Sequence, residues 1–444
     1  MTGLNADASV ASAKLYAKVS WRLIPFLLGL YLICYIDRVN IGFAKLQFLG
    51  DLGLNDAHFG FATGLFFITY SLFDIPSNLV LARIGVRKTL LRIMVLWGLL
   101  TAAQMFIRTT GELYIIRLLF GAAEAGFIPG ILLYLTYWFP DQYRGRVTSL
   151  FLMAIPLSGV IGGPISGMIM QHLNDVGGLR GWQWLFLLEG IPAVILGFVA
   201  YAYLQDGPAQ AHWLTEQERA ALERDLESDR QKGGRGFTHN FGDVFKDPMI
   251  YAMMIMSFTV NCGINAVSFW TPSLLKTAGL ADVGLIGWVT GAISVVSAAA
   301  MVLIGYNSDR ALERRWHFTA SGALGALSLF ALPLAAGNVT LTALVLTFAA
   351  IGSFCIACIY WTVPTSYFRG KGKAGGIAAV SMVGAIGSGV SPSIIGYLKV
   401  ETGSLFIGLA VVGVMMLAGA ILGLFAIPSN SVPAAVATLK PTFP

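Results

Sequence analysis

Charged residues are scarce in this sequence. Asp, Glu, Lys and Arg make up 12% of its 444 residues, against about a quarter in soluble globular proteins. Hydrophobic residues account for 56%. This composition indicates a membrane protein rather than a soluble one.

Twelve stretches are long and apolar enough to cross a bilayer, which takes about 20 mostly apolar residues. Backbone groups in lipid must be satisfied within their own segment, so all twelve are predicted to be helices and the fold to be an all-α polytopic membrane protein. The predicted spans are Leu23 to Ala44, His58 to Ala82, Leu90 to Ile107, Tyr114 to Trp138, Val147 to Gln171, Trp184 to Tyr203, Pro248 to Leu275, Val283 to Tyr306, Phe318 to Ala336, Thr340 to Trp361, Ala374 to Leu398 and Ser404 to Ile427.

One long polar stretch divides the spans six and six. We predict an N-terminal six-helix bundle over residues 1–204, a cytoplasmic linker over 205–247 and a C-terminal six-helix bundle over 248–444. Within the linker, Thr215 and Glu218 have the spacing of a capping box, which predicts a surface helix that braces the two halves. The two bundles already enclose a site, so we expect a monomer.

Small residues recur at matching places in the two halves. The fifth span carries Gly162-Gly163-Pro164, and the eleventh carries Gly387, Gly389 and Pro392. Small residues let helices approach closely, and proline kinks them. Such an internal duplication favours a two-bundle transporter over a channel or a membrane-embedded enzyme.

The positions of the basic residues indicate how the chain is oriented in the membrane. With both termini in the cytoplasm, 22 of the 29 Lys and Arg fall in cytoplasmic segments, as the positive-inside rule requires. The net charge of +6 therefore gives little support to nucleic-acid binding. We predict a multi-pass protein of a bacterial inner membrane, whose first span is retained rather than cleaved as a signal peptide.

Cysteine is also rare. The four cysteines fall inside predicted spans, where Cys355 and Cys358 form a C-x-x-C. Redox or metal chemistry would need polar access and further ligands. We therefore interpret this pair as helix packing and expect no metal site.

Four ionisable residues stand near the middle of apolar spans: Asp37 and Arg38 on the first, and Arg117 and Glu124 on the fourth. Each costs from about 2.5 kcal/mol upward, so such groups persist where they pair or line a cavity. Adjacent residues point about 100° apart around a helix, so Asp37 and Arg38 cannot share one partner face. From their depths along the spans, Asp37 is predicted to pair with Arg117, and Glu124 to lie within reach of Arg38 or of a central cavity.

This arrangement suggests that substrate and proton binding are coupled. A carboxylate substrate would occupy Arg38 with bidentate bonds. Glu124 would then lose its counter-charge in a low-dielectric cavity and take up a proton. Binding of the substrate would raise the affinity for the proton, and binding of the proton would raise the affinity for the substrate. This thermodynamic linkage is what symport requires. The alternative is a static ion-pair network that only fixes helix packing, above all for Arg117.

Other residues in the spans have weaker signals. Asp74 and Glu189 precede Ile75-Pro76 and Gly190-Ile191-Pro192, and we interpret both acids as helix-packing or gating groups. Three aromatic residues lie deep in the spans or beside kinks and are candidates to line a cavity: Tyr35, Tyr70 and Trp361.

Several motifs resemble those of the anion:cation symporter family of the major facilitator superfamily. They include Tyr35-Ile36-Asp37-Arg38-Val39-Asn40, Gly121-Ala122-Ala123-Glu124-Ala125-Gly126 and Gly181-Trp182-Gln183-Trp184. The resemblance implies the major facilitator fold and uptake of organic anions such as tartrate, phthalate and sugar acids. Protons would be the coupling ion, without a cofactor.

The resemblance also implies roles for single residues. Asp37 and Glu124 match proton-handling acids, and Arg38 matches a ligand of the substrate carboxylate. Arg117 matches the partner of the helix-one acid. The aromatic candidates named above match cavity residues.

The C-terminal half departs from the family pattern. Ser381 and Ala385 stand where many members carry asparagines, and Asn265 stands where a tyrosine is common. Unpaired hydroxyls in a buried site are penalised, so the loss of amides argues against a polyhydroxylated substrate. Ser381 and Asn265 are candidate ligands of a smaller hydroxy acid.

The sequence thus predicts a proton-coupled symporter that imports a small organic carboxylate by alternating access, and not an enzyme. An organic-anion exchanger or exporter on the same fold is an alternative. A receptor that binds the anion without translocating it is a third reading.

Overall fold

The computed structural model describes residues 2–233, 247–311, 313–367 and 372–428. Within these ranges twelve helical segments are long and apolar enough to span a membrane, which confirms the predicted fold class. The elements are α1 (Thr2–Val39), α2 (Ile41–Asp51), α3 (Asp56–Ile84), α4 (Val86–Ala103), η1 (Gln104–Phe106), α5 (Thr110–Glu124), α6 (Phe127–Thr136), α7 (Asp141–Leu152), α8 (Ala154–His172), α9 (Gly181–Tyr203), η2 (Pro208–Gln210), α10 (Glu216–Gly233), α12 (Pro248–Thr277), α13 (Val283–Ala311), α14 (Arg315–Ala331), η3 (Leu332–Ala335), α15 (Val339–Tyr367), α16 (Gly372–Thr402) and α17 (Leu405–Ala426).

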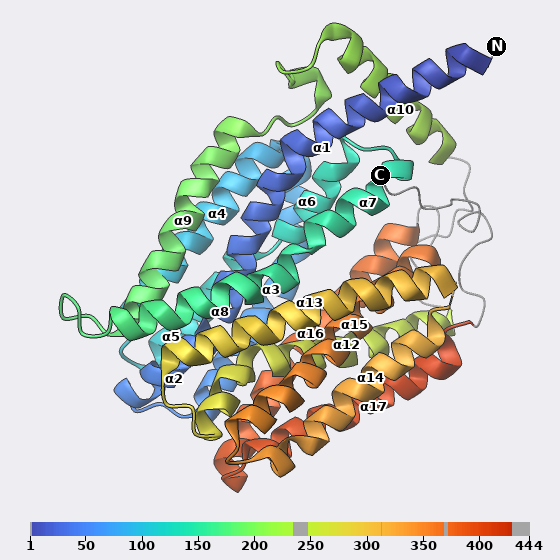
Figure 1. Cartoon of the computed structure of the whole chain (residues 1–444). Helices are drawn as coiled ribbons and strands as arrows, with labels where there is room; N and C mark the ends of the chain where they lie inside the picture. Colours follow the sequence, from blue (N-terminus) through green and yellow to red (C-terminus); the bar gives the residue numbers. More distant parts are fainter. Residues whose placement is uncertain (1, 234–246, 312, 368–371, 429–444) are drawn as a thin grey trace.

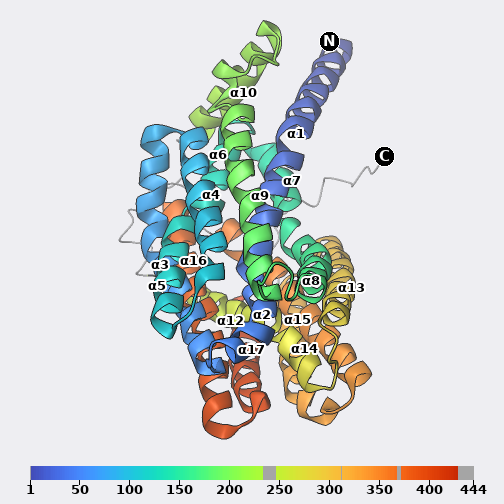
Figure 2. The ribbon, with the colours of Figure 1, turned by 90° about the vertical axis from the view of Figure 1, so that its left-hand side faces the viewer.

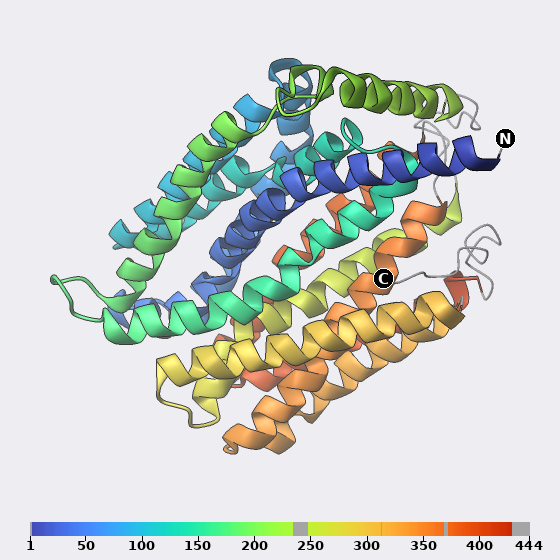
Figure 3. The same cartoon turned by 45° about the horizontal axis from the view of Figure 1, so that its top comes forward.

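The spans form two groups of helices that lie side by side (Figure 1). The elements before α10, coloured blue to green, make up the N-terminal half, and those after it, coloured yellow to red, make up the C-terminal half. Two further views show α10 and the first turns of α1 projecting beyond the same end of the molecule (Figures 2 and 3). We call this end the terminal end. The loops at residues 52–55 and 278–282 lie at the opposite end, which we call the closed end.

The two halves touch through glycine-rich helix faces. On α8, a Cβ at Gly163 would stand 2.9 Å from the carbonyl oxygen of Gly287 on α13. On α3, a Cβ at Gly60 would stand 2.3 Å from the carbonyl oxygen of Pro392 on α16. Of the small residues that indicated close helix approach in the sequence, Gly163, Gly389 and Pro392 therefore lie at the interface between the halves. Gly162 and Gly387 instead pack within their own halves, against Ile36 and Phe258.

Charged groups add to this contact at the closed end. Asp56, at the start of α3, lies 2.6 Å from the ammonium of Lys399 on α16 and 3.8 Å from that of Lys45 on α2. Lys45 is buried, and its Nζ lies 3.3 Å from the ring centroid of Trp270 on α12. A buried ammonium against an indole face gains cation–π attraction. Both cations thus link the N-terminal half to the C-terminal half.

The linker helix is anchored on one half. The predicted capping box forms, because the Thr215 side chain accepts the Glu218 N–H at 3.2 Å and Glu218 accepts the Thr215 N–H at 2.9 Å. Glu218 also binds Lys18 at 2.7 Å, and Asp225 accepts the Tyr16 hydroxyl at 2.9 Å. These contacts fasten α10 to α1. The sequence favoured a brace between both halves, whereas these bonds reach the N-terminal half.

Of three predicted spans that are divided into two helices, one is clearly broken. The first span is divided at Asn40 and the fifth at Met153, and both residues keep right-handed helical dihedral angles. The fourth breaks between α5 and α6, where Gly126 has φ +87°. Only glycine adopts this left-handed conformation without strain. A helix interrupted at mid-membrane exposes backbone polar groups, which is tolerated where protein or a cavity surrounds them.

Candidate functional site

The break in the fourth span places Glu124, the last residue of α5, against the first span. Its Oε1 accepts hydrogen bonds from Nε of Arg38 at 3.0 Å and from Nη2 of the same guanidinium. The thiol of Cys34 approaches the same oxygen at 3.4 Å. The Glu124 side chain is fully buried, whereas that of Arg38 is 11% exposed. The predicted proximity of Glu124 and Arg38 is confirmed as a buried ion pair.

Aromatic rings surround the Arg38 guanidinium. Its carbon lies 5.8 Å from the ring centroid of Tyr35, 5.7 Å from that of Phe66 and 5.1 Å from that of Tyr70. Rings at these distances attract a cation and exclude water from its flanks. The structure therefore brings Tyr35 and Tyr70 to Arg38, as expected for residues that line one site.

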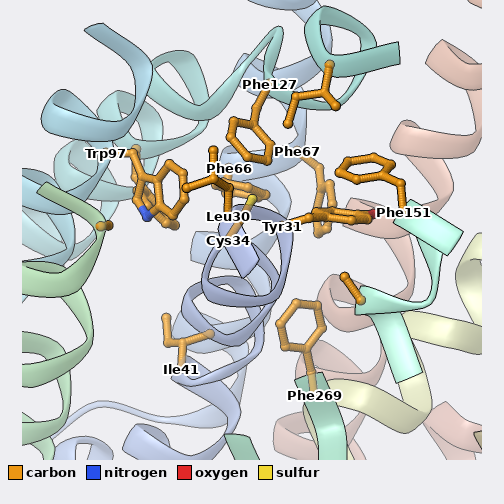
Figure 4. Close-up of a cluster of buried hydrophobic side chains, with 14 of the residues drawn as sticks. Leu30, Tyr31, Cys34, Ile41, Phe66, Phe67, Trp97, Phe127, Phe151 and Phe269 are labelled. Atoms are coloured by element: carbon orange, nitrogen blue, oxygen red, sulfur yellow. The ribbon is translucent and has the colours of Figure 1, made fainter. Parts of the chain in front are cut away.

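A wider apolar layer isolates this part of α1. Figure 4 shows rings from several helices around it, among them Tyr31, Trp97, Phe127 and Phe151. Tyr31 stacks on Phe151 with centroids 4.7 Å apart, and Trp97 meets Phe127 edge-on at 5.5 Å. Phe269 of the C-terminal half approaches the same layer. In such surroundings charges interact strongly because little water screens them.

Asp37 does not pair with Arg117, so that prediction is wrong. Oδ2 of Asp37 accepts a hydrogen bond from the indole N–H of Trp97 on α4, and Thr101 lies 3.4 Å from the same oxygen. The acid therefore points to α4 while Arg38 points to α5. Equal depth in the membrane says nothing about rotation around the helix axis, and rotation decides the partner here.

Arg117 is buried without a hydrogen bond among the described residues. This holds for all three of its guanidinium nitrogens, and its carbon lies 4.9 Å and 5.2 Å from the ring centroids of Phe66 and Phe120. Glu124 is one of the charges that act on it. Arg117 thus remains part of the charge network, held by aromatic faces and long-range attraction rather than by a contact ion pair.

Asp74 supports the break beside Glu124. Gly126 lies beyond the last turn of α5, and its N–H is donated to Oδ1 of Asp74 at 3.0 Å. A Cβ at Gly126 would stand 2.3 Å from the Ser77 hydroxyl. The acid on α3 therefore fixes the point at which the fourth span turns, which agrees with the helix-packing interpretation and positions Glu124 indirectly.

The C-terminal candidates are dispersed. The Asn265 amide donates to Ser388 Oγ at 3.0 Å and to the Asn261 carbonyl at 2.9 Å. Ser381 instead bonds back to the Ile377 carbonyl of its own helix at 2.8 Å. Trp361 meets the neighbouring Tyr360 ring with centroids 5.4 Å apart. Asn265 belongs to a polar cluster between α12 and α16, whereas the other two make local contacts.

Sequence reasoning missed several residues of the site. Asn261 and Ser388 complete the amide cluster, and Trp97 and Thr101 hold Asp37. Asn261 and Asn265 are four apart, so they share one face of an otherwise apolar helix, and this spacing is a signal. The partner of Asp37 carries no such signal, since tryptophan and threonine are common in membrane helices.

Comparison with known proteins identifies the class. A sequence profile described as Major Facilitator Superfamily matches residues 27–392. A Pseudomonas putida protein named "Putative metabolite transport protein NicT" is 41% identical, covering 91% of this chain and 92% of that protein. An Agrobacterium vitis protein named "Putative tartrate transporter" is 41% identical, covering 96% and 94%. The crystal structure of a D-xylose–proton symporter matches with TM-score 0.71 and 19% identity, covering 93% of this chain and 98% of that one.

The chain belongs to the major facilitator superfamily. It is a multi-pass membrane transporter for a small molecule rather than an enzyme. The likeness to the xylose symporter concerns the fold alone.

Proposed function

We propose that this protein is a proton-coupled symporter that imports a small organic carboxylate by alternating access. The observation that carries the proposal is the buried Arg38–Glu124 ion pair, in which the guanidinium keeps 11% exposure while the carboxylate has none. A ligand can therefore reach the cation but not the anion. The printed names of the relatives, a metabolite and a tartrate transporter, support a small organic anion as cargo.

The exchange of partners at Arg38 supplies the coupling. A substrate carboxylate can form two parallel bonds with the guanidinium, and these bonds compete with the two that now reach Oε1 of Glu124. The other carboxylate oxygen, Oε2, has no hydrogen-bond partner among the described residues. Once Arg38 turns to the substrate, an ionised Glu124 would keep only the long-range attraction of Arg117 and would lose its contact ion pair. A buried charge that has lost its contact partner costs several kcal/mol. A proton removes that cost, so substrate and proton bind together.

Alternating access requires that one end of the site open while the other is closed. We assign the closed end to the outside and the terminal end to the cytoplasm, because the basic residues concentrate at the loops of the terminal end. The contacts of Asp56 and of the glycine faces then hold the outer gate shut. Tyr35 and Tyr70 would flank the bound anion, and Asn265, Ser381 and Trp361 would act from the C-terminal half on specificity.

Uptake into proteoliposomes tests the proposal. The substrate is first chosen by screening tartrate, other hydroxy acids, sugar acids and aromatic carboxylates for thermal stabilisation of the purified protein. An inward proton gradient should then drive accumulation in the wild type and in Glu401→Gln, an exposed acid far from the site. Glu124→Gln should abolish the accumulation but retain counter-flow.

Three results would contradict the proposal in different ways. Intact proton-driven accumulation in Glu124→Gln would remove the coupling role from that residue. Counter-flow without any response to the gradient in the wild type would favour an exchanger or exporter. Binding without uptake would favour a receptor.

A further inference from the structure

A third buried acid, Glu189 on α9, lies apart from the Arg38–Glu124 pair. Its Oε2 accepts a hydrogen bond from the Asn40 amide at 2.7 Å, and its Oε1 accepts one from the Ser166 hydroxyl at 2.9 Å. The residue is 7% exposed. Both partners are neutral, and among the described residues no basic side chain forms an ion pair with it. An isolated carboxylate in such a place is costly, and the cost falls when a proton binds.

The Asp37 carboxyl group is close enough to Glu189 to feel its charge. Asn40, which touches Glu189, is three residues beyond Asp37 on the first span, and residues with this spacing face the same side with Cβ atoms about 5–6 Å apart. The donors to Asp37 are also neutral, and its Oδ1 has no hydrogen-bond partner in the described part of the chain. Two carboxyl groups in one apolar environment cannot both ionise cheaply, so they tend to keep one proton between them.

We propose that Glu189 binds a proton that it shares with Asp37, as a second proton site separate from Arg38–Glu124. Its consequence for transport rests on the proposed proton-coupled function. Proton binding itself rests on the geometry of the site alone.

The two partners of Glu189 suit a group that changes its protonation state. The Ser166 hydroxyl and the Asn40 amide can each donate or accept a hydrogen bond. They donate to the ionised carboxylate. A protonated carboxyl group can instead donate to the hydroxyl or to the side-chain oxygen Oδ1 of Asn40, which has no partner among the described residues. An arginine or lysine partner would hold only the ionised form.

Among the described residues, the contacts around Glu189 bring in one further titratable side chain, Asp37. Helix α8 presents Ser166 to Glu189, and the first span presents Asn40. Asp37 feels the charges of both Glu189 and Glu124, and its own donors are Trp97 and Thr101 of α4. Proton exchange at Glu189 is therefore sensed chiefly by Asp37 and, through it, more weakly by the first site.

The site also sits where the first span meets the other half. Asn40 marks the turn between α1 and α2, and two residues later a Cβ at Gly42 would stand 3.0 Å from the carbonyl oxygen of Phe269 on α12. A change in the Glu189–Asn40 bond thus acts beside a close contact between the halves.

Infrared spectroscopy in lipid tests proton binding without a substrate. The C=O stretch of protonated carboxyl groups is followed as pH changes in the wild type, Glu189→Gln, Glu189→Asp and Ser166→Ala. Glutamine keeps the shape and the hydrogen bonds but cannot titrate, so Glu189→Gln should lose part of the pH-dependent band. Glu189→Asp and Ser166→Ala should keep it. A band in Glu189→Gln that titrates as in the wild type would overturn the proposal, even if every variant folds.

Accumulation in proteoliposomes tests the role in coupling. With the membrane potential clamped at zero, each coupled proton contributes about tenfold in accumulation per pH unit, which corresponds to about 1.4 kcal/mol. For the organic acid selected by the stabilisation screen, Glu189→Gln should accumulate about tenfold less than the wild type across one pH unit. Equal accumulation would remove Glu189 from coupling. A wild type that ignores the gradient would instead refute the proposed function, while the infrared result would still decide whether Glu189 binds a proton.

Discussion

Removing one member of the Arg38–Glu124 pair should destabilise the protein more than removing both. Arg38→Met leaves Glu124 fully buried, with the Cys34 thiol at 3.4 Å as its nearest donor. Glu124→Gln leaves a guanidinium that is 11% exposed and can reach water. The double variant removes both members of the pair, but it also takes the attraction of the Glu124 charge away from the buried Arg117. The expected order of stability is therefore the wild type, then the double variant, then the two single variants.

The size of the effect follows from burial. Breaking a buried pair by removing one partner costs about 3–5 kcal/mol, whereas replacing both with neutral groups of similar size is often neutral. For a chain of 444 residues, an unfolding entropy of about 2.1 cal/mol/K per residue gives about 0.9 kcal/mol per kelvin. Arg38→Met should lower the melting temperature by about 3–5 °C. Helices that persist in detergent reduce the unfolding entropy, so the shift is at least this large.

Thermal unfolding of purified variants in detergent measures these differences. The matched control is Arg180→Met, because Arg180 is 43% exposed and pairs with Asp51 and Asp175 at the surface. Exposed pairs contribute under about 1 kcal/mol each, so the control should shift far less. The buried pair would not contribute the free energy assigned to it if Arg38→Met and Arg180→Met had the same melting temperature. The same would follow if the double variant were no more stable than Arg38→Met.

Two further predictions concern the gate and the linker helix. Gly60→Ala adds a Cβ 2.3 Å from the Pro392 carbonyl oxygen, so it should open the closed end. Gly50→Ala is the control, because a Cβ at that position meets nothing within 4 Å. Distances between spin labels on loops of the two halves, measured by electron-spin resonance, should lengthen only in Gly60→Ala. Glu218→Gln should speed hydrogen exchange in the first turn of α10. The bond from Lys18 lowers the pKa of Glu218, so its stabilisation is present above the ordinary carboxyl pKa and is lost as pH falls through the lowered value. Wild-type exchange at such low pH should therefore approach that of the variant, and a constant difference would contradict this.

The fold was predictable because its signal is local. Each span is marked by about 20 apolar residues, and the glycines of α8 and α16 indicate close helix contact from the sequence alone. The capping box at Thr215 is local in the same sense. The interruption at Gly126 was missed, since one glycine in an apolar run is also compatible with a continuous helix, and the carboxylate that stabilises the break comes from another span.

The partners of the buried charges were predictable only in part. The pairing of Arg38 with Glu124 follows from depth and from the need for a counter-charge. The same reasoning predicted that Asp37 pairs with Arg117, and this prediction is wrong. An acid can accept a hydrogen bond from an indole N–H instead, and an arginine can be stabilised by aromatic rings. Sequence distance fixes height along a helix, whereas packing against neighbouring helices fixes which way each side chain points.

Buried charged side chains and buried neutral polar side chains lie in different halves of the protein. Among the described residues, the buried charged side chains all belong to the N-terminal half, while the buried polar groups of the C-terminal half are neutral hydroxyls and the Asn265 amide. In the proposed mechanism, proton binding would therefore change the electrostatics of the N-terminal half alone. A substrate anchored at Arg38 would meet neutral groups across the interface, and these can select a substrate by hydrogen bonding without altering the charge balance that drives coupling.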